Sequence, residues 1–318
     1  MNTMIRIVEY DAVDPLQVLQ LNLLCLDFSL TPETAAIIRR MDPRPFPFFA
    51  LYALEGSTVL GQVGVFRLPV LSEAGAEEVG GVWAVSTHPA WRGQGVATRL
   101  LDEAHARMRA AGLRFSTLGT DSYRLAHRLY ERHGYGDVFS PAMALARSDE
   151  LRGQPDLRAE PAGLAGLSLA DRLFEGLASG SLGFARRHTP FFPFLHARGY
   201  LSAQDLWLIW QGGEAIGYAT AAASNGLLHV RNLLLAPYAD PVAVVAALGQ
   251  ATAARYLRVR LDHPAHAAAF ARAGLLVASP SWATFMVKPL AADATLAEFR
   301  RDYGLDEGRF LISVMDVT

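Results

Sequence analysis

The sequence contains very little cysteine and lysine. Cys25 is its one cysteine, and Lys288 is the one lysine among 29 basic residues in a chain of 318. A lone cysteine cannot form an internal disulfide, so the chain is not a disulfide-stapled domain, and a reducing compartment is expected. Because Cys25 lies among leucines, we expect a buried thiol in the core; a reactive thiol is the alternative.

The sequence also lacks net charge and long apolar runs. Its 29 basic residues face 31 acidic ones, a formal net charge of −2, so no overall positive field exists to hold a nucleic acid. No segment reaches the roughly 18 uninterrupted apolar residues of a transmembrane helix, and residues 1–10 do not read as a secretory leader. We therefore expect a cytoplasmic protein that binds neither nucleic acid nor membrane. The residues do not decide its oligomeric state.

Similar segments recur along the chain at nearly constant distance. The length and the 51% hydrophobic content suffice for two domains. The similar pairs are 39–43 (RRMDP) with 186–190 (RRHTP), 82–89 with 230–237, and 129–134 with 269–274. Their shared order predicts a duplicated unit; chance similarity between alanine-rich segments is the alternative.

The domain boundaries follow from this repeat. We place a first unit at residues 1–149, a second at 155–290 and a tail at 291–318, with the polar stretch 148–156 as a linker. The tail is expected to form a helix at 295–303 and a strand at 310–317.

The first unit reads as a mixed α+β fold that begins with antiparallel strands. Turn residues 55–58 between two apolar runs indicate a hairpin, and Thr31 before Pro32 is a typical N-cap. The expected strands are 5–8, 49–54, 59–66, 79–87 and 114–118, and the expected helices are 16–27, 31–41, 96–111 and 122–133.

A glycine-containing loop, residues 91–98 (WRGQGVAT), joins a strand to the helix at 96–111. The helix has no acidic residue in its first turn, and its free amides and dipole favour an anion. Gly93 and Gly95 let the main chain bend and approach an oxygen closely, while Arg92 offers a charged contact and Thr98 a hydroxyl. A phosphate group is therefore the expected ligand; an ordinary turn with a solvated arginine is the alternative.

Two common phosphate-binding loops do not fit this segment. A P-loop ends in Gly-Lys-Ser/Thr, whereas Val96 and Ala97 follow Gly95 here. A dinucleotide fingerprint needs a third Gly or Ala where Thr98 stands, and an acidic residue closing the next strand, where residues 115–117 are FST.

Residues 92–97 (RGQGVA) resemble the Arg/Gln-x-x-Gly-x-Gly/Ala signature of the GNAT superfamily of acetyl-CoA-dependent N-acetyltransferases. Residues 85–89 (VSTHP) are similar to the strand that approaches this loop in the family, and residues 126–135 (AHRLYERHGY) to its later helix. The second unit resembles the family in element order alone, so the chain looks like a tandem GNAT protein, as in mycothiol synthase and the Eis-type aminoglycoside acetyltransferases. The resemblance implies two GNAT folds in tandem, each a mostly antiparallel central sheet flanked by helices.

The resemblance also implies an acetyl-CoA site. The loop amides are expected to bind the pyrophosphate of the coenzyme, and the preceding strand to pair with its pantetheine. The residues expected to bind acetyl-CoA are Val85, Ser86, Thr87, Arg92, Gly93, Gln94, Gly95, Val96, Ala97 and Thr98. No metal is implied.

Tyr130 occupies the position of the family's usual acid and is the expected catalytic residue. A phenol near pKa 10 is a weaker acid than a thiol near 8.5, so we expect the proton to move to the leaving thiolate in concert with bond breaking. A core role is the alternative, because Ala126, Leu129, Tyr130 and His133 form one helical face.

The second unit lacks these groups. Its loop, residues 238–243 (YADPVA), has no glycine, places Asp240 where an anion would bind and Pro241 where an amide would donate, and Phe270 stands in place of the tyrosine. We therefore expect the first unit to transfer acetyl groups from acetyl-CoA to a primary amine of a small molecule by direct attack, while the second shapes the acceptor site. A non-catalytic acyl-CoA sensor and acetylation of a protein amine are the alternatives.

Candidates for the general base and the acceptor site are less specific. Glu77 or Glu78 could act through water or be solvated charges, His88 could be structural, and the carboxylate of Thr318 could reach the site. Asp27 and Asp42 could attract a cationic amine or be ordinary surface carboxylates. Residues 28–49 are expected to frame the acceptor site. Their prolines and phenylalanines could form an aromatic wall beside the acceptor or simply pack in the core: Pro43, Pro45, Phe46, Pro47, Phe48 and Phe49.

Overall fold

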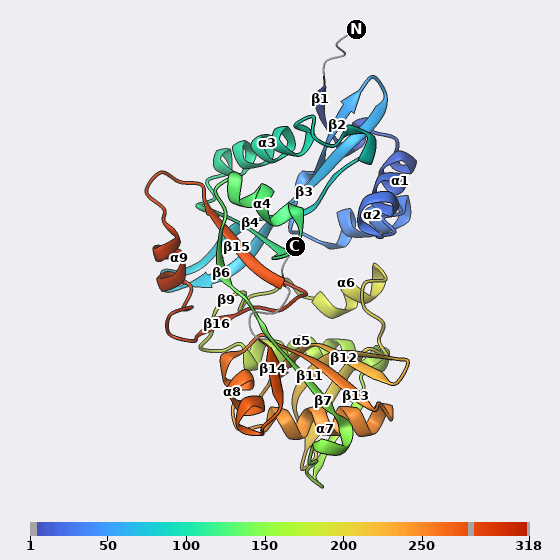
Figure 1. The fold of residues 1–318 in the computed structure, drawn as a ribbon, viewed down its shortest axis with the longest axis vertical. Helices are drawn as coiled ribbons and strands as arrows, with labels where there is room; N and C mark the ends of the chain where they lie inside the picture. Colours follow the sequence, from blue (N-terminus) through green and yellow to red (C-terminus); the bar gives the residue numbers. More distant parts are fainter. Residues whose placement is uncertain (1–4, 279–282, 317–318) are drawn as a thin grey trace.

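The chain forms two β-sheets flanked by helices, and the two sheets lie one above the other along the long axis of the molecule (Figure 1). The structure is a computed structural model that describes residues 5–278 and 283–316. Among these residues no helix is both long enough and apolar enough to cross a membrane.

The first sheet carries the candidate site. Its strand order is β1-β2-β3-β4-β5-β15-β6, antiparallel throughout except for the parallel pair β4 and β5. The strands are β1 (Arg6–Glu9), β2 (Pro45–Glu55), β3 (Thr58–Ser72), β4 (Gly75–Thr87), β5 (Phe115–Asp121), β15 (Ala283–Pro289) and β6 (Gly136–Phe139), and two short strands, β9 (Leu182–Gly183) and β16 (Phe310–Leu311), attach beside β3.

Helices lie on both faces of the first sheet. They are η1 (Tyr10–Ala12), α1 (Pro15–Leu26), α2 (Pro32–Met41), η2 (Pro89–Trp91), α3 (Val96–Ala110) and α4 (Leu125–Arg132). The predicted cap of α2 is confirmed, because the Thr31 hydroxyl accepts from the amide of Thr34 at 3.1 Å and Pro32 opens the helix. The apolar face of α3 packs on β2, β3 and β4 through buried residues such as Leu100 and Leu101.

The second sheet repeats this arrangement. Its order is β14-β7-β13-β12-β11-β10-β8, with β12 and β13 as its parallel pair. The strands are β14 (Leu276–Ala278), β7 (Ala142–Arg147), β13 (Tyr256–Leu261), β12 (Leu227–Leu235), β11 (Glu214–Ser224), β10 (Leu206–Gln211) and β8 (Leu157–Pro161). Its helices are η3 (Ser148–Glu150), α5 (Gly163–Leu177), α6 (Phe191–Ala197), α7 (Pro241–Thr252) and α8 (Pro264–Arg272).

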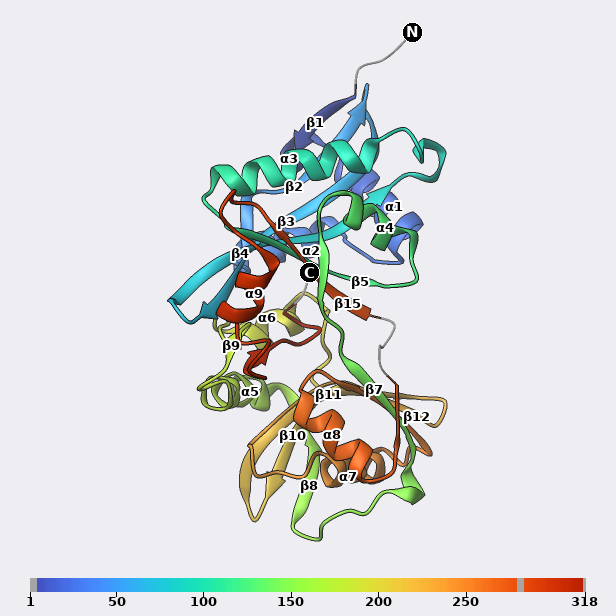
Figure 2. The ribbon, with the colours of Figure 1, turned by 60° about the vertical axis from the view of Figure 1, so that its left-hand side comes forward.

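Each sheet contains one strand from the other half of the chain. β7 follows β6 after two residues but lies in the second sheet, between β13 and β14, while β15 lies in the first sheet, between β5 and β6 (Figure 2). The boundaries predicted at residues 149 and 290 therefore do not separate the sheets. The predicted linker 148–156 lies between β7 and β8 of one sheet, and the chain crosses from the first sheet to the second at residues 140–141.

A buried ion pair holds the C-terminal segment between the two halves. Arg187 donates to both carboxylate oxygens of Asp316 at 2.7 and 2.9 Å, to the hydroxyl of Tyr218 at 2.9 Å and to that of Ser313 at 3.1 Å. The predicted strand 310–317 is therefore wrong for residues 312–316, because residues 313–316 turn to reach Arg187, and Val317 lies outside the described residues. The predicted tail helix is confirmed as α9 (Leu296–Asp302), which begins with a capping box.

Candidate active site

The parallel strands β4 and β5 separate at the centre of the first sheet. They pair only at Gly80 with Ser116 and at Gly81 with Thr117, although both strands are described in full and β4 continues to Thr87. The edge of β4 that carries Val85 and Thr87 consequently faces a gap in the sheet rather than a neighbouring strand. An extended ligand with amide groups can pair with such an edge as an added strand.

A bulge in β4 accompanies this separation. Between Gln62 and Gly64 of β3, β4 contains one extra residue, and Ala84 adopts a left-handed φ of 50°. The amide of Gln62 donates to the carbonyl of Ala84 at 3.2 Å and to Asn22 Oδ1 at 2.8 Å, and Asn22 donates back at 3.1 Å. Both amides are almost fully buried, so they hold the bulge in place. The sequence analysis missed this pair because its members lie 40 residues apart.

The predicted glycine loop, residues 92–95, is exposed where it leads into α3. Gly93 and Gly95 have φ values of 77° and 76°, which glycine adopts without strain. No side chain caps the helix, its first turn holds no acidic residue, and residues 92–95 are exposed. The amides that begin α3 thus remain available to an anion.

The corresponding helix of the second half is already capped. The carboxylate of Asp240 accepts from the amide of Val242 at 2.9 Å, and Pro241 is the first residue of α7. The side chain therefore supplies the negative charge that an anion would bring, and proline removes one donor. Phe270, the counterpart of Tyr130, is fully buried in the core of this half.

Tyr130 lies on α4 with a hydroxyl that makes no hydrogen bond within the described residues. The side chain is 8% exposed and packs edge-on against Tyr135, with ring centroids 5.9 Å apart. Burial raises the pKa of Tyr130 to about 12. The phenol is therefore protonated at neutral pH and has a hydrogen to donate. Its placement agrees with both predicted roles, since it belongs to the apolar core and keeps an available hydroxyl.

Tyr135, by contrast, is committed to a buried hydrogen-bond network. Its hydroxyl lies 2.6 Å from Ser116 Oγ and 2.8 Å from His105 Nε2, and Lys288 Nζ lies 3.2 Å from the other ring nitrogen of His105. Burial and the neighbouring Lys288 lower the pKa of His105 to about 3, so the imidazole is neutral. Lys288 belongs to β15, so the network also fastens the exchanged strand to α3.

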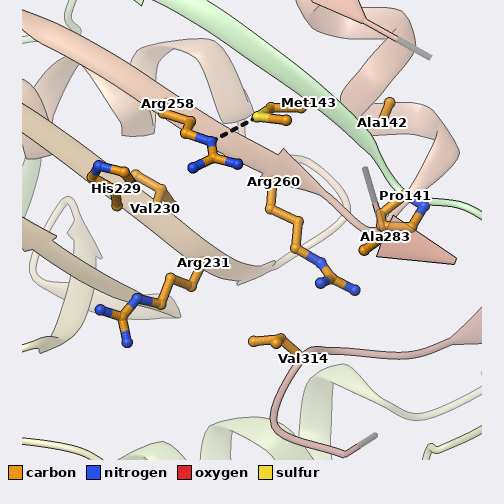
Figure 3. Close-up of a pocket in the computed structure, with 10 residues that line it drawn as sticks. All are labelled: Pro141, Ala142, Met143, His229, Val230, Arg231, Arg258, Arg260, Ala283 and Val314. Carbon is orange, nitrogen blue, oxygen red and sulfur yellow. Dashed lines mark hydrogen bonds between the residues drawn. The ribbon is translucent and has the colours of Figure 1, made fainter. Parts of the chain in front are cut away.

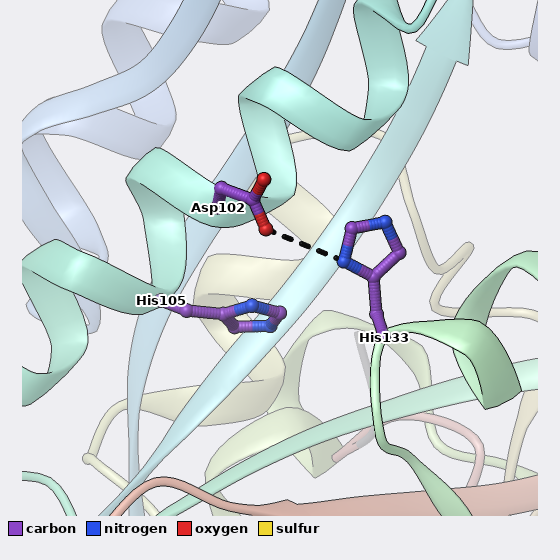
Figure 4. A group of neighbouring side chains, drawn as sticks. All are labelled: Asp102, His105 and His133. Atoms are coloured by element: carbon purple, nitrogen blue, oxygen red, sulfur yellow. Dashed lines mark ion pairs between the residues drawn. The ribbon is translucent and has the colours of Figure 1, made fainter.

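His105, Asp102 and His133 form a group with the composition of a metal site (Figure 4). Asp102 lies 3.5 Å from His133 Nδ1, and the potential ligand atoms lie within 4.8 Å of one another. Both ring nitrogens of His105 already have partners, however, and the ammonium group of Lys288 stands beside them. These contacts fit a hydrogen-bond network rather than a metal cage, because a second cation would be repelled.

The residues expected near the acceptor are not gathered in one wall. Phe46 packs in the core under α3. Phe49 packs instead in the core under α1 and α2, against Trp83, with ring centroids 6.1 Å apart. Trp83 also contacts Phe28 and stacks on Phe66, at 6.3 and 5.2 Å. The aromatic cluster thus centres on Trp83 of β4, which the sequence analysis did not single out.

Of the two carboxylates proposed to attract an amine, only Asp27 is exposed. Asp42 is buried and forms a two-pronged ion pair with Arg44, at 2.8 Å for each contact. This pair lines a pocket of about 260 Å³ where residues 39–44 meet residues 188–191 and Phe194. The prediction that Asp42 attracts a cation is therefore wrong, because Arg44 neutralises it.

The remaining candidates are placed as follows. Glu77 and Glu78 lie near the start of β4, seven or more residues before Val85, or roughly 23 Å along a strand. His88 caps η2 by accepting from the amide of Ala90 at 3.2 Å, a structural role. Thr318 lies outside the described residues.

Cys25 is half-buried rather than part of the core. Its thiol donates to the carbonyl of Thr87 at 3.5 Å, and burial raises its pKa. A thiol with a raised pKa is protonated and weakly nucleophilic at neutral pH. The reactive alternative therefore gains no support from its surroundings.

The sequence model of the acetyltransferase (GNAT) family matches residues 17–135. The chain therefore carries a GNAT acetyltransferase domain. The match covers the glycine loop, both separating strands and Tyr130. A protein with this domain is an acyltransferase. No curated protein matches the chain in sequence.

Solved structures extend the likeness to the whole chain. A probable N-acyltransferase from Enterococcus faecalis is similar over 91% of this chain and 73% of its own, with a TM-score of 0.68 at 14% identity. A GCN5-related N-acetyltransferase from Kribbella flavida is similar over 89% of this chain and 70% of its own, with a TM-score of 0.63 at 18% identity. Eis1 from Mycobacterium abscessus is similar over 92% of this chain and 75% of its own, with a TM-score of 0.61 at 14% identity. At such identities the likeness concerns the fold, and it confirms the prediction of two GNAT folds in tandem.

Proposed function

We propose that the GNAT domain in the first half transfers an acetyl group from acetyl-CoA to the primary amine of a small molecule, in the cytoplasm. Acetyl-CoA supplies the thioester whose carbonyl carbon the amine attacks. The observation that carries the proposal is the difference between the two helix N-termini: α3 offers uncapped amides after Gly93 and Gly95, whereas α7 is closed by Asp240 and Pro241.

Residues at the gap between β4 and β5 fit the coenzyme. The α3 amides would hold its pyrophosphate, with Arg92 adding charge and Thr98 a hydroxyl. Main-chain groups of Val85 and Thr87 would pair with the pantetheine amides, since no strand among the described residues pairs with this edge of β4. The Thr87 carbonyl also accepts from the Cys25 thiol. The Ser86 hydroxyl is buried and has no partner among the described residues, so a ligand would reach it only after a shift of the surrounding side chains.

Tyr130 would act as the proton donor. As the amine nitrogen bonds to the carbonyl carbon, the carbon–sulfur bond breaks and the sulfur gains negative charge. The Tyr130 hydroxyl can donate a hydrogen bond to that sulfur and pass its proton as the bond breaks, which replaces a free thiolate with a neutral thiol. The amine nitrogen gives up one proton to water as the amide forms, and the Tyr130 phenolate regains a proton from solvent. Tyr135 is the poorer donor, because Ser116 and His105 already hold its hydroxyl.

The test combines coenzyme binding with turnover. Calorimetry with acetyl-CoA should show one site per chain, which Gly95→Asp weakens and Asp240→Asn leaves unchanged. Thiol release should follow addition of primary amines from a panel of amino acids, polyamines and aminoglycosides. Coenzyme binding without thiol release for any amine would favour a non-catalytic acyl-CoA sensor, and transfer only to protein amines would overturn the small-molecule assignment.

A further inference from the structure

The parallel strands of the second sheet present four basic side chains on one face. Strand residues alternate between faces, so His229 and Arg231 of β12 share a face, as do Arg258 and Arg260 of β13. His229 pairs directly with Arg258 in the parallel register. The alternate residues of both strands, Leu228, Val230, Leu257 and Val259, are buried in the core on the opposite face.

These side chains surround a pocket of about 240 Å³ between the second sheet and the C-terminal segment (Figure 3). Apolar groups complete its lining: Pro141, Ala142, Met143, Ala283 and Val314. At about 30 Å³ per water, the space equals about eight waters. It accommodates a body of one aromatic ring with a small headgroup and is too small for a whole coenzyme A.

Two acidic residues near the pocket already have partners. Asp262 pairs with Arg260, and Asp316 is held by Arg187. Arg231 has no carboxylate within ion-pair distance among the described residues, and the Nε of Arg258 donates to the thioether of Met143. Burial and the neighbouring Arg258 and Arg231 lower the pKa of His229, so this imidazole is uncharged at neutral pH. The positive charge at the pocket therefore comes from its arginines, and a guanidinium without a carboxylate partner favours an anion.

The pocket lies at the counterpart of the gap between β4 and β5. In the first sheet the parallel pairing ends at Gly81 and Thr117, and in the second it ends at Val230 and Val259. The second junction carries Arg258 where the first carries Thr117 and Arg260 where the first carries Gly119, while Arg231 stands at the position of Trp83. The second half has thus closed its phosphate loop but kept an opening with a different chemistry.

We propose that this pocket binds a small organic anion, an oxyanion headgroup attached to an apolar body the size of one ring. Arg231 and Arg260 point to the same side of β12 and β13 as Val314 (Figure 3), and guanidinium groups bind both carboxylate and phosphate oxygens. The apolar lining takes the body of the ligand. This site is separate from the acetyl-CoA site and does not depend on its function.

The test is calorimetry on the full chain with benzoate and phenyl phosphate, which distinguish the two headgroups. Benzyl alcohol and benzylamine are the neutral and cationic controls. We expect one or both anions to bind, and the controls to bind at least about 10-fold more weakly, because a charged hydrogen bond is lost. Absence of binding by both anions, or equal binding of benzyl alcohol, would overturn the proposal.

Two variants locate the site. Arg231→Gln changes an exposed side chain and should weaken anion binding about 10-fold or more, whereas the matched control Arg172→Gln, on the exposed face of α5, should not. Val314→Phe should fill the pocket and abolish binding. Equal weakening by Arg231→Gln and Arg172→Gln would mean general electrostatic attraction and would contradict a pocket.

Discussion

Replacing Tyr130 with phenylalanine separates its chemical role from its structural one. The substitution removes only the hydroxyl, which has no hydrogen-bond partner in the described part of the chain, and keeps the ring that packs against Tyr135. The free energy of unfolding should therefore change by less than about 0.5 kcal/mol. Phenylalanine also fills the corresponding position of the second half, as Phe270.

The expected effect on turnover is large. With the pKa of Tyr130 raised to about 12 and a thiol near 8.5, complete proton transfer to a free thiolate, after the bond has broken, would be uphill by about 3.5 units, or about 4.8 kcal/mol. The proton must therefore move as the carbon–sulfur bond breaks. Loss of such an acid lowers kcat by about 10²–10⁴-fold, while the KM for acetyl-CoA should hardly change.

The pH profile provides a second readout. A raised pKa keeps the phenol protonated as pH increases, so the wild-type rate should show no decline from Tyr130 until the pH approaches 12. An alkaline decline near pH 10 that disappears in Tyr130→Phe would contradict the effect of burial on this group.

Tyr135→Phe is the matched control. It should give the opposite pattern, a loss of about 1–3 kcal/mol in unfolding free energy, because the Ser116 and His105 partners are left unsatisfied. Steady-state thiol release measures the turnover of both variants, and urea denaturation measures their free energy of unfolding. Unchanged kcat in Tyr130→Phe would remove this residue from the mechanism.

Three further predictions concern other parts of the molecule. Gly95→Asp should weaken acetyl-CoA binding at least about 10-fold by calorimetry and destabilise the fold by about 1 kcal/mol, because φ is 76° there; unchanged affinity would place the coenzyme elsewhere. Arg187→Met should lower the free energy of unfolding by about 3–5 kcal/mol in urea, since Asp316 would stay buried without its partner, and a loss below 1 kcal/mol would contradict that burial. The pKa of His105 is lowered to about 3 in the folded protein, so below pH 6.5 the unfolded chain binds a proton that the folded chain does not. The free energy of unfolding should therefore fall by about 1.36 kcal/mol for each pH unit below 6.5, or by about 2 kcal/mol at pH 5. His105→Gln should remove this pH dependence when denaturation is measured across pH.

Local signals in the sequence predicted the features that depend on neighbouring residues. The cap at Thr31, the glycine turn before α3 and the uncapped first turn of that helix all depend on residues a few positions apart. The cap, the turn and the uncapped helix are largely determined by local geometry, so the structure agrees with these predictions. Tyr130 was singled out by the motif around it, and its catalytic role stays a prediction.

Features that depend on distant partners were missed. Nothing in residues 142–147 distinguishes a strand that returns to its own sheet from one that joins the other, because the alternation of side chains is the same in both. The amide pair of Asn22 and Gln62 and the ion pair of Arg187 and Asp316 join residues 40 and 129 positions apart. Such contacts are selected by packing, which local patterns do not encode.

The exchanged strands have a consequence for synthesis of the chain. β15 lies between β5 and β6 in the first sheet, and it begins about 160 residues after β5 ends. At 5–20 residues per second the ribosome needs about 8–32 s to deliver it. During that interval the nascent first half exposes two unpaired strand edges, so separate expression of residues 1–149 should yield aggregating material rather than a working enzyme.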